Sequence, residues 1–182
     1  MNPALTIAKK EYSLALRSLG TYIIFGVFLL AAGIWFALTA LKLGVADMRE
    51  TLARMHSLFL FFIPAITMGS IAKERSSGTL ELISTLPIRL GHIVWGKFLA
   101  AWAQLTTVLA FSLVFAALIF IFGVGVDAGA IFTGYLGLLC AGAAYIAIGI
   151  FASSLTENQV LAFIIALVIS GVLFLLGRLG EL

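Results

Sequence analysis

Side chains that could perform chemistry are scarce in this sequence. Charged residues make up 10% of its 182 positions, whereas a soluble domain normally carries about 25%. No His-Glu-x-x-His zinc motif is present, and no glycine-rich loop ends in the Gly-Lys-Ser or Gly-Lys-Thr that binds ATP phosphates. The hydroxyls of Thr106, Ser112 and Ser170 fall in apolar stretches, where they more often bond backbone carbonyls than act as nucleophiles. We therefore expect no enzyme and no bound metal or cofactor.

Two further classes of protein fit the sequence poorly. An ion-coupled transporter needs ionisable residues inside its spans and matching broken helices in two related halves, but Pro64 is the only helix-breaking proline in an apolar stretch and has no counterpart. The formal net charge of +3 is small and scattered along the chain, so we expect no nucleic-acid partner.

The longest polar stretch, residues 73–97, is the segment most informative about function. Within it, Ser77, Gly78 and Thr79 can cap a short helix. Glu81 falls in the first turn, where the helix dipole favours a carboxylate, and Pro87 ends the helix. The apolar side chains of this predicted helix are Leu80, Leu82, Ile83 and Leu86.

A helix of about two turns is unstable alone and needs a partner surface. One interpretation is that a cytoplasmic protein binds it and passes movement to the neighbouring spans. The other is that its leucines rest on the membrane domain itself or on lipid headgroups. Amphipathic helices at membrane surfaces are common, so the residues alone favour the second interpretation.

The elements that must position this segment are membrane-spanning helices. Hydrophobic residues make up 63% of the chain, the mean hydropathy is +1.19, and a bilayer core about 30 Å thick requires about 20 apolar residues per helix. We predict an all-α, polytopic membrane protein with a single domain. Its predicted elements are an interfacial helix at residues 1–19 and spans at residues 21–43, 57–72, 98–122, 131–152 and 160–177.

The second predicted span is short and contains Pro64, which favours a kink. A polar connector, residues 47–56, is expected to precede it, and the short span is expected to draw on residues 52–55 of that connector to reach across the membrane. Cys140 falls inside the fourth span, where we expect a small packing residue.

Lysines and arginines favour one orientation of these spans, because cytoplasmic loops carry an excess of them. With the N-terminus inside, the cytoplasmic side would hold seven: Lys9, Lys10, Arg17, Lys73, Arg75, Arg89 and Lys97. The opposite side would hold four: Lys42, Arg49, Arg54 and Arg178. We therefore predict a cytoplasmic N-terminus and a cytoplasmic segment 73–97.

Two side-chain patterns bear on packing within the membrane. Aromatic residues on the first two spans could line a cleft for cargo, but aromatics near interfaces are ordinarily anchors; they are Tyr22, Phe25, Phe28, Trp35, Phe36, Phe59, Phe61 and Phe62. A stripe of mostly small residues on the fourth span should let helices approach closely; it comprises Gly137, Ala141, Ala144 and Ile148, with Ala143 and Ala147 beside it.

Residues 63–82, which read IPAITMGSIAKERSSGTLEL, together with Pro87 and the pair Gly96-Lys97, resemble ABC-2 type transporter permeases. They are most similar to the gliding-motility and nitrous-oxide-maturation permeases, in which a span ending in Glu-Arg leads into Gly-Thr-Leu-Glu and a Gly-Lys closes the loop. The resemblance is detailed over about residues 60–100 and extends to the topology of the whole chain.

The resemblance implies that residues 78–86 form a coupling helix that docks on an ABC ATP-binding subunit, with Glu74 and Arg75 anchoring its base. It implies an exporter subunit of the cell (inner) membrane, surrounded by membrane lipid and paired with a second copy or a related permease. The ATPase activity would then reside in the partner subunit. The alternative is a non-transport scaffold or assembly subunit that the same kind of ATPase drives.

Permeases of this family usually have six spans with both ends in the cytoplasm, whereas this sequence has five predicted spans. We therefore expect either that the chain is a fragment or that it is a divergent member that borrows a helix.

Overall fold

The computed structural model describes residues 3–41, 47–79, 90–123 and 126–179. In these residues every regular element is a helix, which confirms the predicted all-α class. The helices are α1 (Pro3–Leu16), α2 (Leu19–Phe36) with a π-helical end (Ala37–Leu41), α3 (Arg49–Thr67), α4 (Ala72–Ser76), α6 (Leu90–Phe122), α7 (Ala128–Leu155) and α8 (Gln159–Leu179). By length and composition, five helical stretches could cross a membrane: Leu19–Thr39, Arg49–Ser76, Leu90–Phe122, Ala128–Leu155 and Gln159–Gly177.

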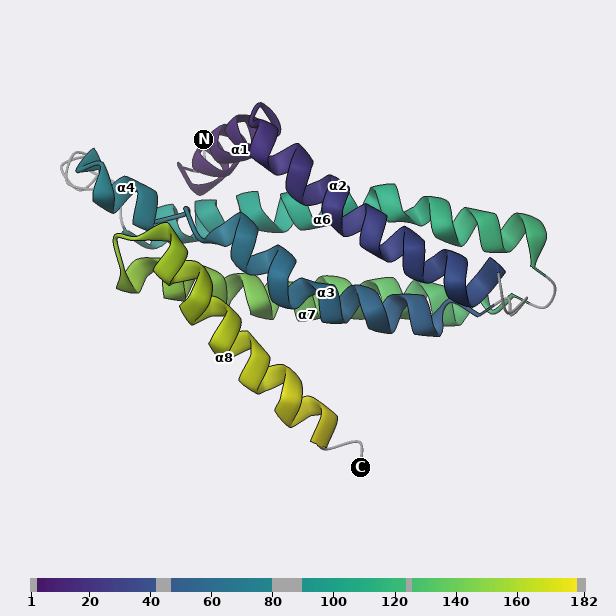
Figure 1. The fold of residues 1–182 in the computed structure, drawn as a ribbon. Helices are drawn as coiled ribbons and strands as arrows, with labels where there is room; N and C mark the ends of the chain where they lie inside the picture. Colours follow the sequence, from purple (N-terminus) through teal and green to yellow (C-terminus); the bar gives the residue numbers. More distant parts are fainter. Residues whose placement is uncertain (1–2, 42–46, 80–89, 124–125, 180–182) are drawn as a thin grey trace.

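Helices α2, α3, α6 and α7 run side by side along the long axis of the molecule (Figure 1). At one end α1 packs against α6, and the Tyr12 hydroxyl of α1 lies 2.7 Å from Thr107 Oγ1 of α6. The short helix α4 lies at this same end, which we call the α1 end (Figure 1). Helix α8 leaves the bundle at an angle, so much of its apolar surface remains exposed.

Helices α3 and α6 begin well before the spans that the sequence predicts, whereas α2, α7 and α8 begin within three residues of them. Helix α3 begins at Arg49 and includes most of the predicted polar connector, because Thr51, Leu52 and Met55 are buried in the bundle. Helix α6 begins at Leu90, so the last eight residues of the predicted cytoplasmic segment belong to it. At 33 residues, α6 is about 50 Å long and exceeds a hydrocarbon core of about 30 Å.

The contact between α2 and α3 is largely aromatic. Phe28 lies 4.8 Å from Phe62 and 6.0 Å from Phe59 between ring centroids, and Phe25 lies 6.0 Å from Phe62. Farther along α2, Phe36 stacks on Phe115 of α6 at 5.2 Å. These rings are buried in the core. Neither sequence interpretation is therefore right for them: they are not anchors at an interface and they do not line an open cleft.

The packed face of α7 is turned relative to the predicted stripe. Gly137 and Ala144 of that stripe are exposed, as is Cys140, so the prediction of close packing there is wrong for contacts within the chain. The close approaches are made by other glycines. Gly142 faces Leu105 and Phe59, and Gly149 faces Thr67 of α3.

Gly149→Ala should loosen the α3–α7 contact, because the new Cβ would overlap the Thr67 side chain. Gly137→Ala is the matched control, since nothing lies within 4 Å of a Cβ there. Both changes gain about 1 kcal/mol of helix propensity, so the difference between the variants isolates overpacking, which typically costs about 1–3 kcal/mol. Thermal unfolding in detergent should show Gly149→Ala melting below Gly137→Ala; equal midpoints would refute this packing.

Candidate functional site

The short helix α4 is the element that leads into the predicted coupling segment. It holds Glu74 and Arg75, and its residues share contacts with α7 and α8. Of the predicted site residues, Glu74, Arg75, Gly78 and Thr79 are described. The others, Leu80, Glu81, Leu82, Ile83, Leu86 and Pro87, lie outside the described residues.

An ion pair joins α4 to α6. Lys97 Nζ donates a hydrogen bond to Glu74 Oε1 at 2.7 Å, and the two side chains are 3% and 20% exposed. Helix α1 packs closely on α6 at this level, since a Cβ on Gly96 would come within 2.7 Å of Ile7. A buried charge is tolerated only with a partner, so Glu74 and Lys97 hold each other in place.

Arg75 connects α4 to the link between α7 and α8. Its Nε lies 3.3 Å from Glu157 Oε1, and its guanidinium also donates to the carbonyl of Ser154 at 3.1 Å. The Arg75 and Glu157 side chains are 45% and 65% exposed, and ion pairs this open contribute at most about 1 kcal/mol. This contact therefore orients α4 more than it stabilises the fold.

The hydroxyl of Ser153 fixes the break between α3 and α4. Ser153 Oγ accepts hydrogen bonds from the N–H groups of Ile71 and Ala72, both at 3.0 Å, and donates to the carbonyl of Met68 at 2.9 Å. The side chain is fully buried. Because the first N–H groups of a helix lack partners within it, α7 supplies the acceptor that α4 needs at its start.

The chain turns sharply as it leaves α4. Gly78 has φ +69°, a conformation that side chains disfavour, and the Thr79 hydroxyl donates to the carbonyl of Glu74 at 3.2 Å. Glu74 thus contacts both the turn and α6. The contacts around α4, which we call the α4 junction, are made by Glu74, Lys97, Arg75, Glu157 and Ser153.

Sequence reasoning found only part of this junction. Glu74 and Arg75 were expected to anchor the coupling helix, but their partners were not identified. The pair Gly96-Lys97 marked the other end of the polar segment, and it could have suggested a lysine returning to Glu74. Ser153 carried no such signal, because only the tertiary contact of α7 with the α3–α4 break gives it a role.

The α4 junction is suited to mechanical connection. In the part of the chain that the structure describes, no group of three or more His, Cys, Asp or Glu side chains could hold a metal ion. Its contacts join the short helix α4 to α6, to α7 and to the link between α7 and α8.

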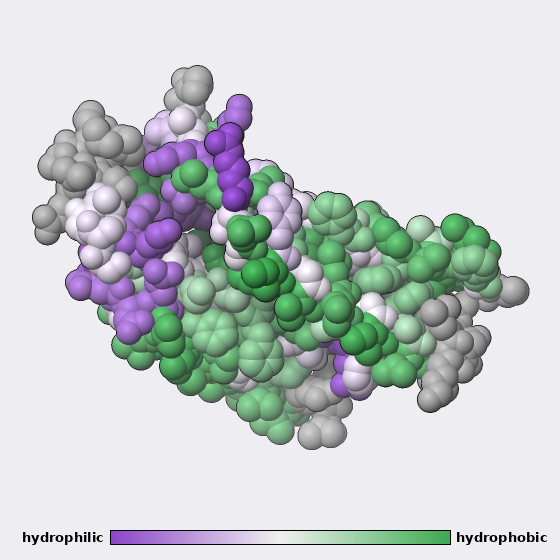
Figure 2. Space-filling view, turned by 45° about the horizontal axis from the view of Figure 1, so that its top comes forward, coloured by the Kyte–Doolittle hydropathy of each residue, from purple (hydrophilic) through white to green (hydrophobic). Residues whose placement is uncertain are grey.

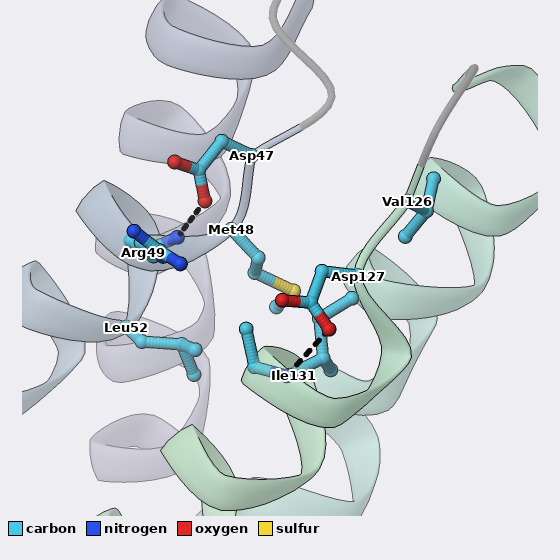
Figure 3. A pocket seen from close by; sticks show the side chains of 8 residues that line it. Asp47, Met48, Arg49, Leu52, Val126, Asp127 and Ile131 are labelled. Carbon is cyan, nitrogen blue, oxygen red and sulfur yellow. Dashed lines mark hydrogen bonds between the residues drawn. The ribbon is translucent and has the colours of Figure 1, made fainter.

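A pocket of about 290 Å³ lies at the opposite end of the bundle, between the segments that precede α3 and α7 (Figure 3). Its two carboxylates are already engaged: Asp47 Oδ1 accepts from the backbone N–H of Arg49 at 2.9 Å, and Asp127 Oδ1 accepts from that of Ala130 at 3.1 Å. Met48, almost fully buried, lies between the two segments (Figure 3). These residues order the two helix starts, and we assign no ligand to the pocket.

Comparison with known proteins gives one family. Residues 55–179 match the sequence model of the ABC-2 family transporter proteins. Over 107 residues the chain is 37% identical to the probable ABC transporter permease protein NosY of Stutzerimonas stutzeri, an alignment that covers 54% of this chain and 38% of the relative. Over 101 residues it is 38% identical to the protein of the same name from Pseudomonas aeruginosa (52% and 37% covered). The chain thus matches less than two fifths of the length of these relatives.

Breaking the buried pair should destabilise the protein more than breaking an exposed one. Lys97→Met leaves Glu74 without its partner and should cost about 3–5 kcal/mol. The double variant Glu74→Gln with Lys97→Met should recover most of that loss, since neither charge then remains. Glu50→Gln is the control: it breaks the exposed pair with Arg54 and should change stability by less than about 1 kcal/mol. Thermal unfolding of the parent protein, Lys97→Met, the double variant and Glu50→Gln measures these differences. A double variant no more stable than Lys97→Met would contradict the prediction.

Proposed function

Since the chain belongs to the ABC-2 family transporter proteins, we propose that it is a membrane-spanning permease subunit driven by a separate ATP-binding subunit. Its multi-pass helical structure and its similarity to permeases named NosY support this proposal. In this proposal the ATP-binding subunit, and not this chain, hydrolyses ATP. It sits in the cell membrane, the inner membrane of a two-membrane cell, beside a second copy or a related permease.

The observation that carries the proposal is the α4 junction. Residues 78–87 directly follow α4 along the chain, and we propose that they dock on the ATP-binding subunit. Glu74 reaches α6 by a buried ion pair, and Arg75 reaches the α7–α8 link. A displacement of the docked segment would then move α4, and α4 would carry α6 and α7 with it.

The proposed direction of transport is export, with the α1 end of the molecule in the cytoplasm. The excess of Lys and Arg expected on that side supports this orientation. Lys73, Arg75 and Lys97 all belong to the α4 junction or its immediate neighbours, so positive charge gathers at the end where α4 leads into the proposed docking segment.

Leu82→Asp should abolish binding of the ATP-binding subunit while leaving the permease in the membrane, because the change places a charge in the proposed docking helix and in no span. Ser76→Asp is the matched control, as it adds the same charge to an exposed position on α4. Copurification of the two subunits measures the effect. If Leu82→Asp retains the ATPase as well as Ser76→Asp does, the docking assignment fails.

Cysteine labelling tests the orientation in a Cys140→Ala background. Ser84→Cys should react with a membrane-impermeant maleimide only after the cells are opened, since residue 84 lies in the proposed cytoplasmic segment. Ala128→Cys, exposed at the opposite end of the bundle, should react in intact spheroplasts. The reverse pattern would invert the topology and exclude docking of residues 78–87 on a cytoplasmic ATPase.

A further inference from the structure

A half-open cavity of about 360 Å³ lies at the α1 end, lined by residues of α1, α2, the end of α3, α6, Lys73 of α4 and Gln159 of α8. It is lined by apolar side chains such as Ile24 and Ile66 and by several polar ones. The polar side chains used below are Glu11, Thr21, Lys73, Lys97 and Gln104. A half-open cavity of mixed polarity at the polar end of a membrane domain can hold the polar part of an amphipathic ligand.

Two of these polar side chains are largely buried and have no hydrogen-bond partner among the described residues. Gln104 of α6 is 7% exposed and Thr21 of α2 is 8% exposed. The described residues give neither side chain a hydrogen bond, yet neither is sealed away from the cavity that it lines. Because both polar groups remain accessible from the cavity, they are available to form hydrogen bonds with a ligand there.

Charged groups of both signs line the same cavity. Lys73 and Glu11 have no ion-pair partner within the described residues, and they are exposed and half-buried, respectively. Lys97 gives one hydrogen bond to Glu74, although an ammonium group has three hydrogens to donate. The cavity therefore offers donors for an anion and, at Glu11, an acceptor for a cation.

The depth of these groups matches a lipid headgroup. Seven residues separate Lys97 from Gln104 on α6, or about 10 Å along the helix axis. Polar side chains gather at the α1 end of the molecule, whereas the sides of the bundle are mostly apolar (Figure 2). The cavity thus runs from the polar end into the apolar bundle, as an amphipathic ligand requires.

We propose that this cavity binds the headgroup of one zwitterionic glycerophospholipid. Its phosphate accepts hydrogen bonds from Lys73, Gln104 and Thr21, its ammonium group lies near Glu11, and its glycerol end meets Ile24 and Ile66. The lipid would fill the space between α1 and the spans and hold α1 on α6. This site does not depend on the proposed transport function.

Native mass spectrometry of the whole chain, purified in detergent and supplied with phosphatidylethanolamine, tests the proposal. We expect one lipid per chain and a higher melting temperature with lipid. Gln104→Leu and Thr21→Val should each weaken lipid binding about tenfold, the effect of losing a hydrogen bond to a charged acceptor. Thr106→Val and Thr133→Val are the controls, since both threonines are exposed on the spans, and they should bind lipid normally.

Two further ligands separate the possible sources of binding. Diacylglycerol lacks the phosphate and should bind no better to the parent protein than to Gln104→Leu, and inorganic phosphate should not raise the melting temperature. The proposal is overturned by a cavity that retains no lipid, by equal phosphatidylethanolamine binding in Gln104→Leu and Thr106→Val, or by stabilisation with inorganic phosphate alone.

Discussion

A lysine buried at the end of a membrane domain must keep a carboxylate beside it, and this constraint organises the α1 end of the protein. Lys97 is on α6 and Glu74 is on α4, so the pair forms only if the chain after α3 breaks and returns toward α6. Helix α1 packs on α6 at the level of Gly96 and leaves Lys97 almost fully buried. Removing either charge would leave the other unpaired in a medium that penalises it.

The same ion pair helps to explain how the short helix α4 can be coupled to the long helices α6 and α7. A five-residue helix has little stability of its own, but α4 is held by an ion pair from α6, a serine hydroxyl from α7 and a carboxylate after α7. We therefore expect α4 to move with these helices. By contrast, α8 diverges from the bundle (Figure 1), and much of the apolar surface of its C-terminal half is exposed, although Phe174 lies 5.5 Å from His56 of α3 between ring centroids.

Hydropathy predicted the five spans well. Burying polar groups in lipid is costly, so a spanning segment must be apolar over its whole length. Helix starts were harder to predict: the second span was expected to draw on residues 52–55, but α3 extends farther back, to Arg49, where Thr51 is fully buried against a surface that no local pattern reveals. The predictions for the aromatic residues and for the packed face of α7 were wrong for the same reason. In an almost wholly apolar helix every face looks alike, and only contacts such as Gly149 with Thr67 distinguish one from another. For the candidate site, the motif predicted Glu74 but not its partner.

We propose that α4 and α6 move as one unit when the proposed ATP-binding subunit acts. Spin labels on Ser76→Cys and Gly91→Cys, both exposed at the α1 end, report the α4–α6 distance in a Cys140→Ala background. A second pair, Ser76→Cys and Leu30→Cys, reports the distance from α4 to α2, a helix that contributes no residue to the α4 junction; Leu30 is exposed on α2. Double electron–electron resonance on the complex, with and without a non-hydrolysable ATP analogue, should show an unchanged first distance and a changed second distance. A first distance that changes while the second stays fixed would contradict the account.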